Sequence, residues 1–119
     1  MSNITTQDLI DEVRKISAEM PDFVYMTGDV AGCSYFGRGI GDPTGQCCIM
    51  GQVFKNLSID TSKIDESHEG VSTVGELIWD QVIPVTPLNK SQVDWLNLVQ
   101  SLQDEGISWG EAVSIVDSE

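Results

Sequence analysis

Basic residues are scarce in this chain. Its 119 residues include 6 Lys and Arg against 19 Asp and Glu, so the formal net charge at pH 7 is −13, and no basic residue follows Lys90. Nucleic acids and anionic lipid surfaces are bound through clustered Lys and Arg that neutralise phosphate. The composition therefore argues against direct binding to nucleic acid or to a membrane. It favours a partner protein with a basic surface.

Long apolar stretches are also missing. No run of the sequence approaches the roughly 20 apolar residues that cross a bilayer. The opening residues, MSNITTQDLIDE, have neither the basic start nor the apolar run of a secretory signal. We therefore expect a cytoplasmic protein, and a chain of this length predicts one compact globular domain over residues 1–119.

Cysteine and histidine are too few and too poorly spaced for a metal site. The chain has three cysteines, Cys33, Cys47 and Cys48, and one histidine, His68. Adjacent cysteines on a helix diverge by about 100°, and the C-x-x-C spacing typical of zinc ligands does not occur. We expect no metal, no cofactor and no disulfide, because an odd cysteine count without an export signal indicates reduced thiols.

Helix-start signals recur along the chain. Four pairs have the spacing of a capping box or an N-cap, in which a side chain accepts from the backbone three residues later. These pairs are Thr5 with Asp8, Thr73 with Glu76, Asn89 with Gln92, and Ser108 with Glu111. A further helix is expected from Thr44 to about Leu57, buried at the centre because apolar residues cover more than half of it. The sequence thus predicts about five helices.

A small β-hairpin is expected near residues 23–36. The segments FVYM and CSYF are short and rich in aromatic and β-branched residues, and turn-forming residues separate them. The predicted fold class is therefore an α-rich α+β domain.

The segment of residues 28–51 is the first candidate site. It holds all three cysteines and seven of the eleven glycines. Glycines ahead of a helix start let the backbone approach an anion, and the helix dipole lowers the pKa of thiols in a first turn. The alternative is a tight turn that feeds a buried helix with packed thiols. If the segment is functional, the chain is a thiol-dependent enzyme or ligand-binding domain that uses Cys33, Gly39, Gly41, Thr44, Cys47 and Cys48.

The C-terminal part is the second candidate site. Residues 91–119 contain six acids and no base, and the helix-turn-helix pattern there would be repelled by phosphate. Trp95 and Trp109 are expected to hold the two helices together, each with a partner for its N–H. The candidate partner-binding residues are Asp94, Asp104, Glu105, Glu111 and Asp117. A homodimer formed through the helix at Thr44–Leu57 is a third possibility. Neither the partner-binding model nor the homodimer model assigns a catalytic residue.

Two segments of the chain share a residue pattern with a known group of proteins. The first has Cys33-x-Tyr35, then Pro43, Cys47, Ile49 and Gly51, and the second has Val99-Gln100, Gln103-Asp104-x-Gly106 and Trp109-Gly110-x-Ala112-Val113. The chain resembles small, uncharacterised accessory proteins of actinobacteria and their phages. The resemblance implies an accessory protein, for which we expect the role of a phage-encoded inhibitor or modulator of a host protein with a basic surface.

Overall fold

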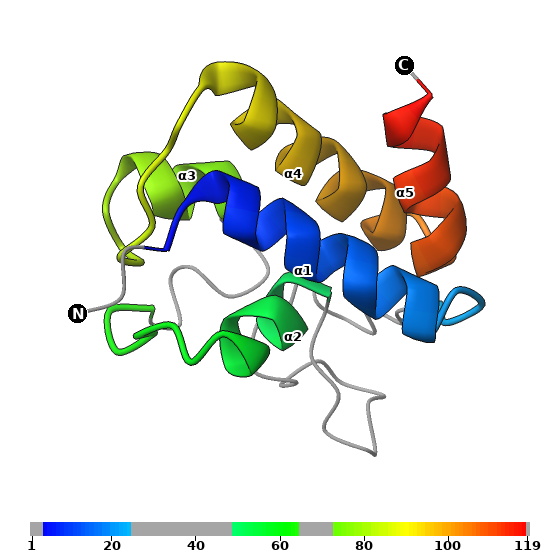
Figure 1. Ribbon diagram of the computed structural model, residues 1–119, viewed down its shortest axis with the longest axis horizontal. Helices are drawn as coiled ribbons and strands as arrows, with labels where there is room; N and C mark the ends of the chain where they lie inside the picture. The colour runs from blue at the N-terminus through cyan, green and yellow to red at the C-terminus, as the bar shows by residue number, and fades with distance from the viewer. Residues whose placement is uncertain (1–3, 25–48, 65–72, 119) are drawn as a thin grey trace.

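The computed structural model describes residues 4–24, 49–64 and 73–118, and five helices lie within these ranges (Figure 1). They are α1 (Thr6–Glu19), α2 (Ile49–Asn56), α3 (Val74–Trp79), α4 (Lys90–Asp104) and α5 (Trp109–Asp117). In Figure 1, α1 crosses the middle of the molecule, with α2 on one side of it and α4 and α5 on the other.

The described part of the chain is mainly α, so the predicted α+β class is wrong. Helix accounts for 63% of these residues and no strand occurs among them. The one β-type feature they contain is an isolated parallel bridge between Thr5 and Thr86. Of the predicted hairpin, Phe23 and Val24 are described, and they do not form a strand. The Phe23 carbonyl instead accepts from the N–H of Trp109 at 2.9 Å. The other hairpin residues, 25–36, lie outside the described residues.

The capping signals at the starts of α1, α3 and α5 are confirmed. Thr5 caps α1 and Thr73 caps α3, each in a reciprocal box with the acid three residues later. Ser108 caps α5 by accepting from the N–H of Glu111. Each cap gives a partner to a backbone donor that has none inside the helix.

The cap of α4 forms only one of the two hydrogen bonds of a capping box. Asn89 accepts from the N–H of Gln92 at 2.9 Å as expected. The Gln92 side chain, however, donates to Gln7 at 2.8 Å and accepts from the hydroxyl of the fully buried Thr6. Because these tertiary partners compete for it, Gln92 joins α4 to α1 instead of closing a capping box.

Three helices end in a Schellman motif, in which a residue with positive φ follows the helix. The residues concerned are Ser58 after α2, Gln81 after α3 and Gly106 after α4, with φ of 54°, 57° and 91°. After α3, Val82 donates to Leu77 at 2.9 Å and Gln81 donates to Ile78 at 3.1 Å, which is the paired bonding of this motif. α3 therefore ends at Trp79.

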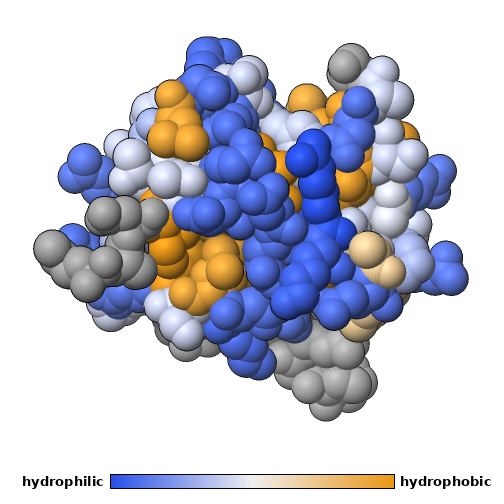
Figure 2. Space-filling view, in the orientation of Figure 1, coloured by the Kyte–Doolittle hydropathy of each residue, from blue (hydrophilic) through white to orange (hydrophobic). Residues whose placement is uncertain are grey.

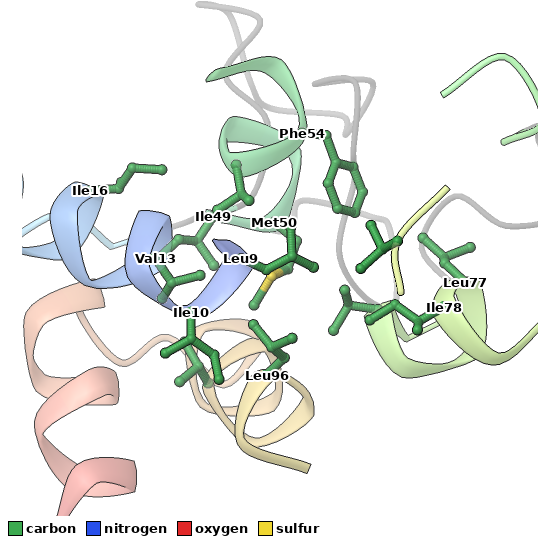
Figure 3. Close-up of a cluster of buried hydrophobic side chains, with 14 of the residues drawn as sticks. Leu9, Ile10, Val13, Ile16, Ile49, Met50, Phe54, Leu77, Ile78 and Leu96 are labelled. Atoms are coloured by element: carbon green, nitrogen blue, oxygen red, sulfur yellow. The ribbon is translucent and has the colours of Figure 1, made fainter. Parts of the chain in front are cut away.

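All five helices contribute to one hydrophobic core. Figure 3 shows side chains of α1, α2, α3 and α4 meeting in it, and Trp109 of α5 is also buried. Met50 and Val53 of α2 are fully buried. The expectation of a buried helix is thus confirmed for Ile49–Asn56, while its predicted start at Thr44 lies outside the described residues.

Amide side chains on one face of α4 hold the starts of two other helices. Gln100 accepts from the N–H of Val74 at 2.8 Å, and Asn97 accepts from the N–H of Gly75 at 2.8 Å. Gln103, which is fully buried, accepts from the N–H of Ile49 at 3.3 Å. Because the three amides recur every third residue, they lie along one face of α4. They give partners to backbone donors that a helix start leaves unbonded.

Candidate functional site

The turn after α1 lies directly on the first turn of α5. The N–H of Gly110 donates to the carbonyl of Pro21 at 2.9 Å, and the N–H of Trp109 donates to that of Phe23 at 2.9 Å. The rings of Phe23 and Trp109 are 4.4 Å apart between centroids. Trp109 also donates from its indole to Gln103 at 3.3 Å, which fixes the end of α4 beside the same turn. The ends of α1 and α4 therefore meet the start of α5.

Five acidic residues belong to the helix ends that meet here, and we call this set the acidic end. One is the last residue of α1, one lies in the turn after α1, two are at the end of α4, and one is in the first turn of α5. Those that are exposed make no side-chain hydrogen bond or ion pair with any residue of the described ranges. The members of the acidic end are Glu19, Asp22, Asp104, Glu105 and Glu111.

Two apolar side chains are exposed in the same turn. Met20 is 39% exposed and Val24 is 40% exposed. Met20 belongs to the stripe of α1 that would otherwise face the core, but it follows the last helical residue and is its C-cap. The acidic end thus combines carboxylates with apolar contact area.

Asp104 differs from the other members because it is partly buried. Burial raises the pKa of its carboxyl to about 6, although the donated hydrogen bond from the Gln103 amide acts in the opposite direction. Partial desolvation disfavours the charged form of a carboxyl group. The charge of the acidic end therefore depends on pH close to neutrality.

Two of the sequence-predicted acids are paired elsewhere. Asp117 forms an ion pair with Arg14 at 2.9 Å and accepts from the indole of Trp95 at 2.8 Å. The guanidinium of Arg14 lies 5.2 Å from the centre of the Trp95 ring. The hydrogen bond from Arg14 is the main cause that lowers the pKa of Asp117, and it also raises the pKa of Arg14. Asp94 pairs with Lys90 at 3.0 Å.

The predicted acidic surface is therefore divided. Asp104, Glu105 and Glu111 are brought together, whereas Asp94 and Asp117 each meet a base and do not join them. Arg14 escaped the sequence reasoning because it lies 103 positions before Asp117. The expectation that Trp95 and Trp109 join α4 to α5 with partners for both indole N–H groups is confirmed by their bonds to Asp117 and Gln103.

Glu19 and Asp22 were missed by the sequence reasoning. They lie on either side of Pro21 at the end of α1, and acids around a helix end are ordinary surface residues. Nothing local indicates that this turn packs against residues 109 and 110. The one sequence signal for Glu19 and Asp22 is the presence of acids on both sides of a helix end.

The residues of the other predicted site lie outside the described ranges. Cys33, Gly39, Gly41, Thr44, Cys47 and Cys48 all fall within residues 25–48. Within residues 4–24, 49–64 and 73–118, no three His, Cys, Asp or Glu side chains are placed to hold a metal ion. None of the helices described in these ranges is both long enough and apolar enough to span a membrane.

Comparison of the chain with protein-family models, with curated proteins and with solved structures gave no match.

Proposed function

We propose that this chain is a small acidic interaction protein that binds a basic surface of another protein through the acidic end. The observation that carries the proposal is that the helix ends which meet here carry Glu19, Asp22, Glu105 and Glu111 together with exposed Met20 and Val24. No base of the described residues is bonded to these acids. Opposite charge speeds the encounter of two proteins, and apolar contact area then holds the complex.

The position of these acids also supports a role beyond stability. The C-terminal end of a helix carries partial negative charge, so a nearby carboxylate costs about 0.3–1 kcal/mol. Glu19 ends α1, and Asp104 and Glu105 end α4, while neither helix has a basic residue in its last turn. Residues that reduce stability where a neutral side chain would serve are typical of a binding surface.

The expected partner is a host protein that this chain inhibits or modulates in the cytoplasm. This part of the proposal rests on the resemblance to accessory proteins of actinobacteria and their phages. A homodimer through the helix at Thr44–Leu57 is the competing interaction model. It is disfavoured because Met50 and Val53 of α2 are fully buried in the core and are not available to a second copy.

The test uses charge reversal with a control of equal net charge. Glu105→Lys and Glu111→Lys together change the acidic end by four charge units. Asp80→Lys and Asp94→Lys make the same change at exposed positions that are not part of it. The three proteins are immobilised and exposed to an actinobacterial lysate at low and high salt. Association with the protein retained by the unmodified chain is then followed by stopped flow.

We expect the unmodified chain and the control to bind at rates that fall as salt rises. The variant at the acidic end should associate at least about tenfold more slowly, with a weaker salt dependence. Equal rates for both variants would remove the acidic end as the contact surface. Rates that do not respond to salt would remove the charge-based mechanism.

A further inference from the structure

A groove lies at the opposite end of α1 from the acidic end. It has a volume of about 410 Å³, and its walls come from Ile4 ahead of α1, the loop after α2 and the segment that joins α3 to α4. Because α1 has 14 residues, the two sites are separated by about 21 Å of helix. Figure 2 shows a hydrophobic area on this side, between the start of α1 and the segment that follows α2.

The apolar wall of the groove is aliphatic. Its apolar lining residues are Ile4, Val82, Ile83, Pro84 and Val85, and no aromatic side chain of the described residues lines it. Ile83 and Val85 are buried at its base, held by the bonds of Ile83 to Leu77 and of Thr86 to Ile4. The wall is therefore a fixed part of the fold, suited to a branched aliphatic group.

Two opposite charges stand at the same groove without contacting each other. Asp60 and Lys63 both line it, and they form no ion pair. Asp60 is oriented by the N–H of Ser62, which donates to one of its oxygens at 2.9 Å. Lys63 makes no side-chain bond to a described residue. Within the described residues, neither charge is neutralised by an ion pair. The hydrogen bonds from Ser62 are the main cause that lowers the pKa of Asp60, and Lys63 adds to it.

A ligand that pairs with both Asp60 and Lys63 must carry one positive and one negative charge. An ammonium group would bind the Asp60 carboxylate, and a carboxylate would bind the Lys63 ammonium. The volume lies at the small end of the range of about 300–1,000 Å³ typical of ligand pockets. From these features we propose that the groove binds a free aliphatic α-amino acid, with its side chain against Ile4, Val82 and Val85.

The test uses L-leucine and two analogues that each lack one charge. 4-Methylpentanoate has no ammonium group, and L-leucine amide has no carboxylate. Binding to the full chain is followed by amide NMR shifts. We expect saturable shifts at residues 83–86 with millimolar L-leucine, and affinity at least about tenfold lower for both analogues, because each leaves one charge of the site unsatisfied.

Variants identify the charges that recognise the ligand. Asp60→Asn and Lys63→Gln should each weaken L-leucine binding about tenfold, whereas Lys55→Gln, an exposed lysine of α2 outside the groove, should not change it. All three positions are exposed, so the fold is retained and can be checked from the same spectra. The proposal is overturned by an absence of shifts at residues 83–86, by analogues that bind as well as L-leucine, or by unaffected binding in the Asp60 and Lys63 variants. None of these results bears on the acidic end.

Discussion

The backbone N–H of Gly110 donates to the carbonyl of Pro21 at 2.9 Å, and a Cβ atom at Gly110 would lie 2.9 Å from that same oxygen. It would also lie 2.8 Å from the Cβ of Pro21. The turn after α1 can approach α5 this closely only because residue 110 has no side chain. This approach brings the turn that carries Asp22 against the first turn of α5, which carries Glu111.

Gly110→Ala should destabilise the protein. Helix propensity alone would make alanine more stable by about 1 kcal/mol. The collision with the Pro21 backbone should outweigh this gain and lower the free energy of unfolding by about 1–3 kcal/mol in total. Urea denaturation measures the change. Ser114→Ala, on an exposed position of α5, is the control and should be neutral or slightly stabilising, and a more stable Gly110→Ala would contradict the close contact.

Gln103→Met should be among the most destabilising substitutions of a polar residue. Methionine keeps the length of the side chain but leaves the N–H of Ile49 and the indole of Trp109 without their acceptor. Two buried donors without partners should lower the free energy of unfolding by about 2–4 kcal/mol. The matched control is Gln52→Met, because Gln52 is half-buried and makes no side-chain bond to a described residue. Equal losses in both variants would show that the bonds of Gln103 add nothing.

Ser58→Gly and Gln81→Gly should each stabilise the protein. Both residues have positive φ at the end of a helix, where a side chain costs about 1–2 kcal/mol. Glycine avoids this cost but loses more entropy on folding, so we expect a net gain of about 0.5–1 kcal/mol in the free energy of unfolding.

Gly106→Ala, at the third such position, should have the opposite effect and lower stability by about 1 kcal/mol. Ser101→Gly serves as the control in thermal unfolding, since glycine at an exposed helical position should destabilise. If Ser58→Gly and Gln81→Gly behave like this control, the positive φ values are not those of the protein in solution.

Asp104→Asn should stabilise the protein at neutral pH but not in acid. The folded pKa of Asp104 is raised to about 6 from an ordinary value of 3.8, so the folded state holds this proton more tightly than the unfolded state. Stability from this group is therefore fully present below the ordinary pKa and is lost as pH rises towards 6. Asparagine carries no charge and can still accept from the Gln103 amide.

The measurement is thermal unfolding of both proteins between about pH 4 and pH 8. We expect the variant to gain over the unmodified chain as pH rises through the window between the two pKa values, and the gain to level off above about pH 6. Glu105→Gln removes one exposed charge from the same end and gives the size of the general charge effect. A difference between Asp104→Asn and the unmodified chain that does not vary with pH would contradict the raised pKa.

Local sequence determined where four helices start. Thr5, Thr73, Asn89 and Ser108 cap α1, α3, α4 and α5 because a short polar side chain reaches the backbone three residues later whatever the rest of the fold does. The end of α4 at Gly106 was equally predictable, since glycine adopts positive φ without strain. The burial of α2 followed from its apolar residues alone.

The hairpin prediction was wrong because local preference decided it alone. Phe23 has a side chain suited to a strand. Its carbonyl, however, accepts a hydrogen bond from the N–H of Trp109, and its ring packs against the Trp109 indole. These contacts join residues far apart in the chain, and tertiary contacts override strand propensity.

The candidate site was decided mostly by the tertiary structure. The sequence named Asp104, Glu105 and Glu111, but it could not add Glu19 and Asp22 or remove Asp94 and Asp117. Charges act through space, so the character of an acid depends on which distant residue the fold places next to it. Arg14, which lies far away in the sequence, forms an ion pair with Asp117. Burial at the end of α4 raises the pKa of Asp104 to about 6, close to neutral pH. Composition fixed the excess of negative charge, and packing determined where that charge is free to act.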